Sequence, residues 1–311
     1  MKKKLLFLLL TLMPMGMLAQ TVVTDPDTGL KYLTDDTNLE NKNAWYIYVA
    51  SNNDDLGIQI DGVDANQYFV SHPNFRPWVR NQCNAGTDGK IYWSTLQEKT
   101  SFSYNATNGT GDNRNVTYKG IEYFPNLTSF TDANSSGATS IVGDFSKNKK
   151  LSSLTWSNSI ARDKITSLDI SNTALTSWTV PTGSTAGFTL TAKNTALTSL
   201  NIASSNVSIL DVSGSANLTT VTTKTANSPY LREVNIVGTN ITSLDLTKYT
   251  YLKKVTFDYG KMTWGTSGAD LLVPSGFIAI RRGNVTDLLK SENPLTIDVT
   301  NEDEKDIDLS G

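Results

Sequence analysis

The chain has almost no histidine or cysteine, and this scarcity excludes much of the common chemistry of enzymes and metalloproteins. Among 311 residues there is one histidine, His72, and one cysteine, Cys83. Structural zinc sites use four cysteine or histidine ligands, and catalytic sites usually use two or three. An intramolecular disulfide is impossible, and a serine or cysteine nucleophile would depend on His72 as its base. Because no phosphate-binding loop or nucleophile elbow is visible either, we expect neither an enzyme nor a cofactor.

Apolar residues and charged residues are also few, at 38 % and 18 % of the chain. Serine and threonine take their place, with 30 and 41 copies, and half of these lie within 151–250. Such a chain can form a core only if its large apolar residues recur at strict spacing. Its 27 basic residues against 30 acidic ones give a net charge of −3. That balance excludes the basic surface that a nucleic-acid partner requires.

The N-terminus has the pattern of a secretory signal. Lys2–Lys4 precede the apolar run LLFLLLTL at 5–12, and the small residues Gly16 and Ala19 follow. A basic region, a short apolar run and a small residue at the cut are typical of a signal peptide. We therefore predict a signal peptide at 1–20 and a mature chain that is secreted, periplasmic or at the cell surface. We expect no lipid attachment at the new N-terminus and no membrane span in the mature chain.

A six-residue phrase recurs from residue 151 to residue 257, with apolar residues at its first, fourth and sixth positions. Clear copies are ITSLDI at 165–170, LTSLNI at 197–202 and ITSLDL at 241–246. Two successive phrases make a unit of roughly 20–24 residues, which lies within the length range of leucine-rich repeats. The fourth-position residues, which we expect in the core, are Leu154, Leu168, Trp178, Phe188, Leu200, Leu210, Val221, Val234, Leu244 and Val255.

The alternation in each phrase lasts a few residues before a turn-forming residue interrupts it, which favours short strands over helices. We therefore predict a mainly β fold, a leucine-rich-repeat solenoid with coils of about 21–23 residues and one strand on each side of every coil. Leu168 and Ile170 should point inward, and Ser167, Asp169 and Ser171 outward. Asparagines beside the strands should shape turns, or could form a ladder of ligand-binding amides; they are Asn172, Asn194, Asn206, Asn217 and Asn240.

The region before the repeats is rich in aromatic residues and predicts an α+β capping region. We expect strands at 44–50 and 56–60 and a short helix at 74–83. A solenoid exposes apolar surface at its ends, so its terminal units are atypical. The aromatic residues are therefore expected to form the core of this cap, and a carbohydrate platform is the alternative.

Two segments of this region carry a family resemblance. FRPWVRNQCNAGTDGKIYWSTLQE at 75–98 and YKGIEYFPNLTSF at 118–130 resemble the N-terminal region of exported bacterial leucine-rich-repeat proteins. The downstream LTSLDI-like phrases are similar to the double-stranded coils of internalin-type and gut-bacterial surface repeats. The resemblance implies an exported repeat protein with an N-terminal cap and a role in adhesion or recognition. It implies no particular ligand, because such scaffolds serve many.

In that family the loop after the helix is EF-hand-like, with oxygen ligands at positions 1, 3, 5, 9 and 12. Anchored on Gly89 at position 6, those positions hold Asn84, Gly86, Asp88, Tyr92 and Thr95 in this chain. One carboxylate and no bidentate glutamate are too few ligands, so we expect no calcium or other metal here. Glu98 comes three positions after Thr95 and could form a capping box with it.

The expected organisation has four regions: the signal peptide at 1–20, the N-terminal capping region at 21–117, the solenoid at 118–260, and a C-terminal cap with an acidic tail at 261–311. The spacing of the phrases breaks down after Phe257, which predicts an irregular final coil. The acidic end, NEDEKDIDLSG at 301–311, is typical of a solvated terminus, with an interaction tail as the alternative.

The sequence favours an exported, non-enzymatic binding or adhesion module whose ligand is a protein or a glycan. The alternatives are a structural subunit of a cell-envelope assembly and, less favoured, a glycan-active enzyme. A binding solenoid would present outward polar side chains in a pre-ordered array, which lowers the entropy cost of association. The candidate ligand-binding residues are Ser167, Asp169, Ser199, Asn201, Asp211, Asn235 and Asp245, with Tyr249 and Tyr251 as an aromatic anchor.

Overall fold

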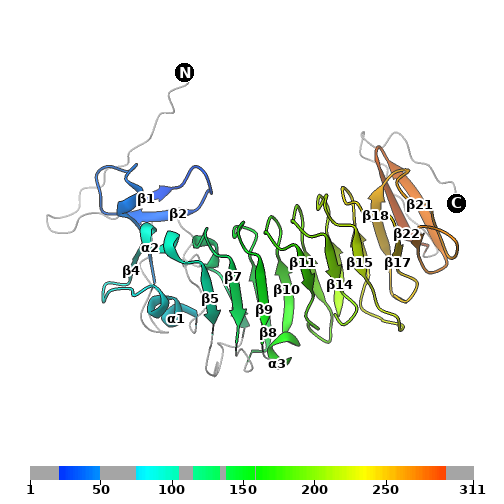
Figure 1. The fold of residues 1–311 in the computed structure, drawn as a ribbon, viewed down its shortest axis with the longest axis horizontal. Helices are drawn as coiled ribbons and strands as arrows, with labels where there is room; N and C mark the ends of the chain where they lie inside the picture. Colours follow the sequence, from blue (N-terminus) through cyan, green and yellow to red (C-terminus); the bar gives the residue numbers. More distant parts are fainter. Residues whose placement is uncertain (1–20, 50–74, 105–114, 134–137, 158, 292–311) are drawn as a thin grey trace, which may run out of the picture.

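A computed structural model describes residues 21–49, 75–104, 115–133, 138–157 and 159–291. These residues form a mainly β structure, an elongated solenoid of about six turns (Figure 1). The expectation of a β-solenoid is therefore confirmed. The expected signal peptide, the expected strand at 56–60, His72 and the acidic tail lie outside the described residues.

One side of the solenoid is a nine-stranded sheet, here called the long sheet. Its strands from β6 to β18 come from successive coils and pair in parallel, and β22 and β21 continue it as an antiparallel hairpin. In spatial order the strands are β6 (Asn115–Thr117), β8 (Ser140–Asp144), β10 (Ile165–Asp169), β12 (Phe188–Thr191), β14 (Val207–Asp211), β16 (Glu233–Asn235), β18 (Lys254–Asp258), β22 (Val285–Lys290) and β21 (Phe277–Arg282).

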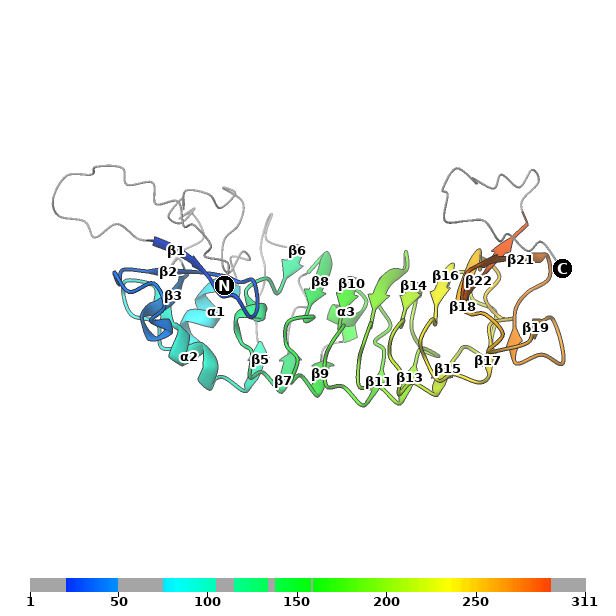
Figure 2. The ribbon, with the colours of Figure 1, turned by 90° about the horizontal axis from the view of Figure 1, so that it is seen from above.

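The opposite side of the solenoid consists of three separate three-stranded sheets (Figure 2). The first contains β5 (Ser101–Tyr104), β7 (Ser129–Asp132) and β9 (Ser153–Trp156), and the second contains β11 (Ser177–Thr179), β13 (Ser199–Asn201) and β15 (Thr220–Thr222). The third contains β17 (Leu244–Asp245), β20 (Leu271–Leu272) and β19 (Trp264–Gly265). Each coil thus supplies one strand to each side, which leaves a narrow interior between them.

The coils differ in length along the chain, as the numbers of the paired residues show. Ser101 of β5 pairs with Ser129, and Ser129 pairs with Ser153. Further along, Ser177 pairs with Ser199 and Ser199 with Thr220, so these partners are closer in sequence. The expected coil length therefore holds for the steps from Ser177 to Thr220 and is exceeded in others, including the later step from Ile209 to Glu233. Parallel pairing already begins at β5, N-terminal to the expected start of the solenoid.

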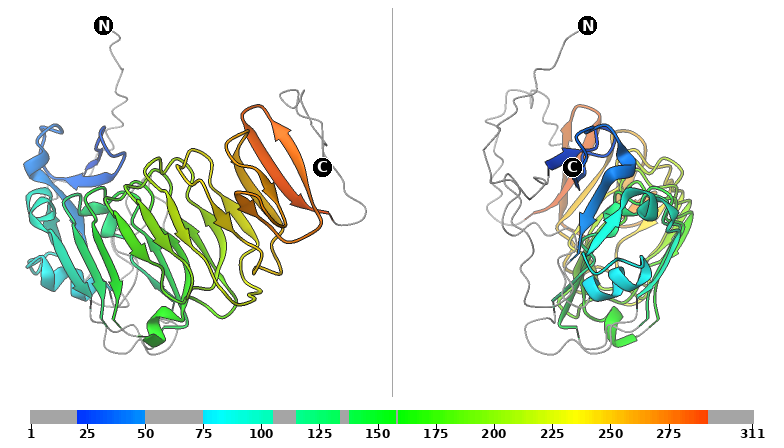
Figure 3. Two further views of the ribbon diagram at one scale, coloured as in Figure 1. Left: turned by 45° about the vertical axis from the view of Figure 1, so that its right-hand side comes forward. Right: turned by 90° about the vertical axis from the view of Figure 1, so that its left-hand side faces the viewer.

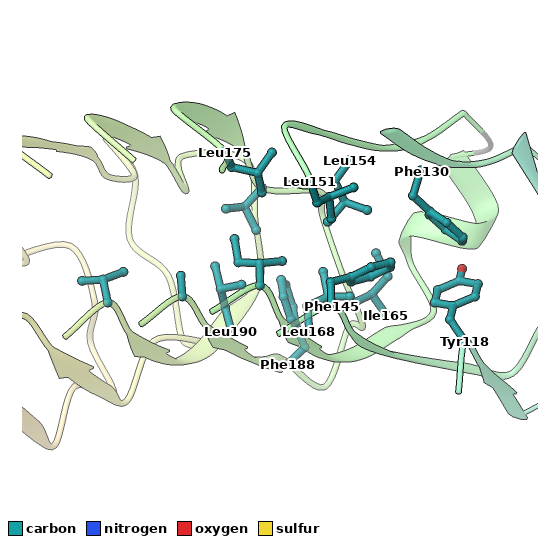
Figure 4. Packing of buried hydrophobic residues seen from close by; sticks show 14 of the residues in the cluster. Tyr118, Phe130, Phe145, Leu151, Leu154, Ile165, Leu168, Leu175, Phe188 and Leu190 are labelled. Atoms are coloured by element: carbon teal, nitrogen blue, oxygen red, sulfur yellow. The ribbon is translucent and has the colours of Figure 1, made fainter. Parts of the chain in front are cut away.

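Inward side chains from both sides fill the interior of the coils. Leu168 and Ile170 are fully buried, as the alternation predicts, because successive side chains of a strand point to opposite faces. Figure 4 shows Leu154 and Leu175 from one side facing Leu168 and other residues from the long sheet. Ser171 was expected to point outward but is buried, and its hydroxyl accepts a hydrogen bond from the Lys193 N–H at 3.0 Å.

The turns that follow the long-sheet strands repeat one backbone conformation. Asn172 and Asn194 have φ values of 61° and 52°, and Gly214 and Gly238 hold equivalent positions with φ of 72° and 71°. Each turn bonds to the next coil, as when the N–H of Gly214 donates to the Val237 carbonyl at 2.8 Å. The expectation that asparagines shape the turns is thus confirmed for these two, because asparagine tolerates left-handed backbone.

A four-stranded antiparallel sheet and two helices lie at the N-terminal end of the stack (Figure 1). Helix α1, which lies where the sequence predicts a helix, packs on the first coil: the rings of Trp78 and Phe102 lie 4.9 Å apart. The elements of this end are β1 (Thr21–Thr24), β2 (Lys31–Thr34), η1 (Lys42–Ala44), β3 (Trp45–Tyr48), α1 (Phe75–Gln82), β4 (Lys90–Tyr92) and α2 (Trp93–Glu98). Two short helical segments interrupt the coils, η3 (Ile121–Tyr123) and α3 (Ser159–Arg162).

At the C-terminal end the hairpin of β21 and β22 lies against the last parallel strand, β18 (Figure 3). Val255 of β18 pairs with Leu288 of β22, and both side chains are fully buried. The loss of phrase spacing after Phe257 therefore corresponds to a change from parallel coils to an antiparallel hairpin. Within the described residues, no helix is long and apolar enough to cross a membrane.

Candidate functional site

The predicted ligand-binding residues lie on two opposite sides of the solenoid. Ser167 and Asp169 are on β10, and Asp211 and Asn235 are on β14 and β16, all in the long sheet. Ser199 and Asn201 are on β13 and Asp245 is on β17, on the other side. The structure therefore does not bring these residues together into one ladder.

All five predicted aspartates and asparagines also have a local structural role. Each accepts a hydrogen bond from the backbone N–H two positions later, which forms an Asx-turn at the end of its strand. The oxygens of Asp169 and Asp245 accept at 2.8 Å from Ser171 and Thr247. The remaining bonds are Ala203 to Asn201 at 2.9 Å, Ser213 to Asp211 at 3.0 Å and Val237 to Asn235 at 3.2 Å. In these five phrases the fifth position is Asp or Asn, whose side-chain oxygen supplies the acceptor that the following turn needs.

The two tyrosines of the predicted aromatic anchor have different environments. Tyr251 is exposed, with 57 % of its surface accessible. Tyr249 is buried, and its hydroxyl accepts a hydrogen bond from the Lys224 N–H at 3.1 Å. Tyr249 therefore belongs to the core and cannot act as a surface anchor beside Tyr251.

The outward surface of the long sheet contains charged groups that pair with one another. Asp144, Asp169 and Asp211 lie in one register column, and the Lys193 ammonium contacts Asp211 at 3.0 Å. Further along the same column, Asp287 is buried and accepts a 2.6 Å hydrogen bond from the Thr256 hydroxyl. Much of the polar capacity of this surface is thus used in holding adjacent coils together.

The other side has a surface of a different kind, here called the hydroxyl face. It consists of the outward residues of β5, β7, β9, β11, β13 and β15; none of them is charged, none is buried, and all except Asn201 carry a hydroxyl group. They are Ser101, Ser103, Ser129, Thr131, Ser153, Thr155, Ser177, Thr179, Ser199, Asn201, Thr220 and Thr222. Such residues suit this position because Ser and Thr side chains of adjacent strands can bond across the sheet, as Thr131 and Thr155 do at 2.9 Å.

The hydroxyl face is hollowed where its two sheets meet. β9 and β11 belong to different sheets, and a groove of about 490 Å³ lies across this break. Its lining residues are Ser152, Ser153, Leu154, Thr155, Leu175, Ser177, Trp178, Thr179, Ser199, Leu200, Asn201 and Thr222. None of them has a titratable side chain, so the groove can bind by hydrogen bonds and apolar contact but contains no acid or base of its own.

Trp178 is the aromatic residue of the groove. It occupies the fourth position of its phrase, where Leu154 and Leu200 are buried, yet Trp178 is only half-buried. Its indole Nε1 donates to the Leu154 carbonyl at 3.0 Å. The indole thus bonds to a backbone oxygen of the neighbouring coil at the break between the two sheets. We expected Trp178 in the core; a tryptophan in a column of Leu, Val and Phe was the signal in the sequence.

Two of the predicted ligand-binding residues, Ser199 and Asn201, line this groove. The Oδ1 atom of Asn201 accepts from the Ala203 N–H, which fixes the side-chain amide. No described residue accepts a hydrogen bond from its Nδ2 group, which leaves two donor hydrogens for a ligand. The groove therefore combines an indole, a fixed amide and several hydroxyls.

The loop with the EF-hand-like pattern is hydrogen-bonded to Arg80 of helix α1. The Arg80 guanidinium donates to the Val49 carbonyl at 2.5 Å and to the Gly86 carbonyl at 2.9 Å. Asp88, the loop's single carboxylate, accepts from the Lys90 N–H at 3.1 Å. A cationic side chain thus contacts one carbonyl oxygen of the loop, that of Gly86. Among the described residues, no group of three His, Cys, Asp or Glu side chains is placed to hold a metal ion.

The single cysteine does not form a reactive site. Cys83 is 5 % exposed beneath helix α1, and burial raises the pKa of its thiol to about 11. A thiol with so high a pKa is almost entirely protonated at neutral pH, whereas the thiolate is the nucleophile.

Comparison of the chain with protein-family models and with curated proteins gave no match.

Proposed function

We propose that this protein is an exported, non-enzymatic binding module of the leucine-rich-repeat class, which holds a protein or glycan ligand in the groove of the hydroxyl face. The observation that supports this proposal best is the groove itself: a hollow lined by the half-buried indole of Trp178 and by uncharged hydrogen-bonding groups. Its volume of about 490 Å³ lies within the range of small-ligand sites.

The class rests on the repeat pattern and on the arrangement of the coils. Phrases with inward residues at the fourth position, mostly Leu and Val, agree with a leucine-rich-repeat solenoid, as do the short steps from Ser177 to Ser199 and on to Thr220. The N-terminal elements would act as its cap, because α1 covers the aromatic side chains of the first coil. Export rests on the signal-like pattern at 1–20 and on the resemblance of residues 75–98 and 118–130 to exported repeat proteins.

A non-enzymatic role agrees with the chemistry of the groove. General acid–base catalysis needs a side chain that exchanges protons near neutral pH, and no lining residue has one. Ser and Thr hydroxyls become nucleophiles only beside a base. The arrangement is therefore suited to recognition, where preorganised donors and acceptors reduce the entropy cost of binding.

The proposal is tested with the chain from residue 21 onward on arrays of glycans and host or bacterial proteins. Asn201→Ala removes the amide of the groove, and Asn235→Ala is its matched control on the long sheet. Both residues accept the same type of Asx-turn bond, so the two variants should lose similar stability. We expect Asn201→Ala to weaken binding of the captured ligand and Asn235→Ala to leave it unchanged.

Two results would contradict the proposal. If Asn235→Ala abolishes binding while Asn201→Ala does not, the ligand site is on the long sheet. If the wild-type chain shows no saturable binding at micromolar concentration, the recognition role itself is refuted.

A further inference from the structure

We propose that the ligand of the groove is a neutral oligosaccharide, one of whose sugar rings packs against Trp178 while its chain runs across the strands from β9 toward β15. This inference rests on the proposed binding function and specifies the chemistry of the ligand. Three features of the groove support it: the residue types that surround the indole, the absence of charge, and the direction in which the groove extends.

The groove places an aromatic ring among hydroxyl groups. Ser177 and Thr179 flank Trp178 on β11, and Ser199 and Asn201 lie on the next strand. An indole offers an apolar surface, whereas a hydroxyl can both donate and accept a hydrogen bond. A sugar ring has the complementary pattern, with C–H groups on its face and hydroxyls around its rim. Charged side chains of a peptide ligand would instead find no ionic partner among the lining residues.

The environment of the indole also limits its movement. The 3.0 Å bond from Nε1 to the Leu154 carbonyl holds the polar edge of Trp178 toward β9. Its hydrogen-bonding capacity is then used within the protein, so the indole can contribute only apolar contact to a ligand. The polar contacts must come from the surrounding hydroxyls and from the Nδ2 group of Asn201.

The absence of charge on the hydroxyl face distinguishes neutral from anionic sugars. Sulfate, phosphate and carboxylate groups are bound in proteins by arginine, lysine or clustered backbone N–H groups. No outward residue of β5, β7, β9, β11, β13 or β15 has a charged side chain. Because an anionic sugar would lose hydration without gaining an ion pair, the groove favours an uncharged one.

The groove extends along the solenoid rather than along one coil. Its lining residues come from β9, β11, β13 and β15, which are neighbours in space but lie in successive coils. Paired strands are about 4.8 Å apart, so β11, β13 and β15 alone span roughly 10 Å, and β9 lies beyond them across the break between the sheets. This length exceeds a single sugar ring, and the ligand is therefore an oligosaccharide whose affinity rises with chain length.

The test is calorimetric titration of the chain from residue 21 onward with neutral homopolymers of glucose, mannose, galactose and xylose, from monosaccharide to hexasaccharide. Sulfated and uronic-acid oligosaccharides of matched length are titrated in parallel. We expect saturable binding of at least one neutral series, with affinity that rises beyond the monosaccharide and then levels off. Affinity for the charged series should be lower.

Trp178→Leu introduces the residue found at the same position in the neighbouring phrases, so the coil should retain its packing. We expect it to weaken neutral-oligosaccharide binding by about two- to tenfold, in line with the contribution of an aromatic contact. Trp264→Leu is the matched control, since Trp264 is also half-buried but lies on β19, outside the groove. Thr179→Arg tests the site without touching the core, because its long side chain fills the groove from an exposed position.

The outcomes separate the inference from the function on which it rests. If charged sugars or a protein bind better than neutral sugars, and Trp178→Leu and Thr179→Arg weaken that binding, the groove is a binding site but the neutral-sugar assignment is wrong. If a neutral sugar binds with the same affinity to both variants, its site lies elsewhere and the inference is overturned. If no ligand of any class binds, the binding function is refuted together with the inference.

Discussion

Gly183→Ala is the sharpest test of how tightly the coils are packed. Gly183 has a φ of 75°, and a Cβ atom added there would lie 2.1 Å from Cδ1 and 2.3 Å from Cε1 of Phe188. Phe188 is 2 % exposed inside the stack, so its ring has no free space to move into. Gly260 is a matched control: its φ is 70°, but an added Cβ would meet no atom within 4 Å.

Both substitutions strain the left-handed backbone, but only Gly183→Ala also overpacks the core. Left-handed backbone costs a residue with a Cβ atom about 1–2 kcal/mol, while the lower entropy of the unfolded chain offsets about 0.4–1 kcal/mol. Gly260→Ala should therefore lower the free energy of unfolding by about 1 kcal/mol. Overpacking against Phe188 adds about 1–3 kcal/mol, so Gly183→Ala should lower it by about 2–4 kcal/mol.

Urea unfolding at 25 °C, followed by circular dichroism, measures both effects. The midpoint should fall clearly further for Gly183→Ala than for Gly260→Ala, with similar dependence on urea concentration. Equal midpoints for the two variants would refute the packing of Phe188 beneath this turn. They would also show that the interior of the coils yields to an added methyl group.

Two further predictions concern the stack and its N-terminal end. Leu210→Asp places a carboxylate at a position that is 2 % exposed. Because coils stabilise their neighbours, we expect hydrogen-exchange protection to be lost in β12, β14 and β16 together. Unchanged protection in β12 and β16 would contradict the idea that neighbouring coils share their stability. Burial acts to raise the pKa of Asp25, but hydrogen bonds and the charge of Lys42 outweigh it and lower that pKa below its usual value. The 2.9 Å ion pair between Lys42 and Asp25 should therefore stabilise the fold above about pH 4 and lose its effect as Asp25 is protonated. We therefore expect the melting temperatures of wild type and Lys42→Met to differ at neutral pH and to converge toward about pH 2. A gap that stays constant with pH would show that the pair contributes nothing.

Local patterning predicted much of the fold correctly, for a physical reason. Strand side chains alternate between two faces, so an apolar residue between two polar ones indicates which faces the core. Leu168, Leu200 and Leu210 are buried as this rule requires. Trp178 departs from it, because its indole lies at the break between two sheets and bonds to the Leu154 carbonyl.

The pattern could not assign each phrase to a side of the solenoid. ITSLDI at 165–170 and ITSLDL at 241–246 are almost identical, yet the first forms β10 in the long sheet and the second forms β17 on the opposite side. Both phrases satisfy the same local rule. The side is set by the length of chain that separates a phrase from its partners in the coils before and after it, which is a non-local property.

For the candidate site too, one property follows from the local sequence and another depends on the tertiary structure. Its uncharged character follows from the sequence, because the repeats are rich in serine and threonine and their outward positions can be identified by alternation. The location of the groove does not follow from the sequence, because the groove exists only where β9 and β11 do not pair and their two sheets meet. The alternation of residues along the sequence thus determined which side chains point into the core and which point to solvent. The stacking of coils of unequal length decided which side of the solenoid each strand joins and where the groove lies.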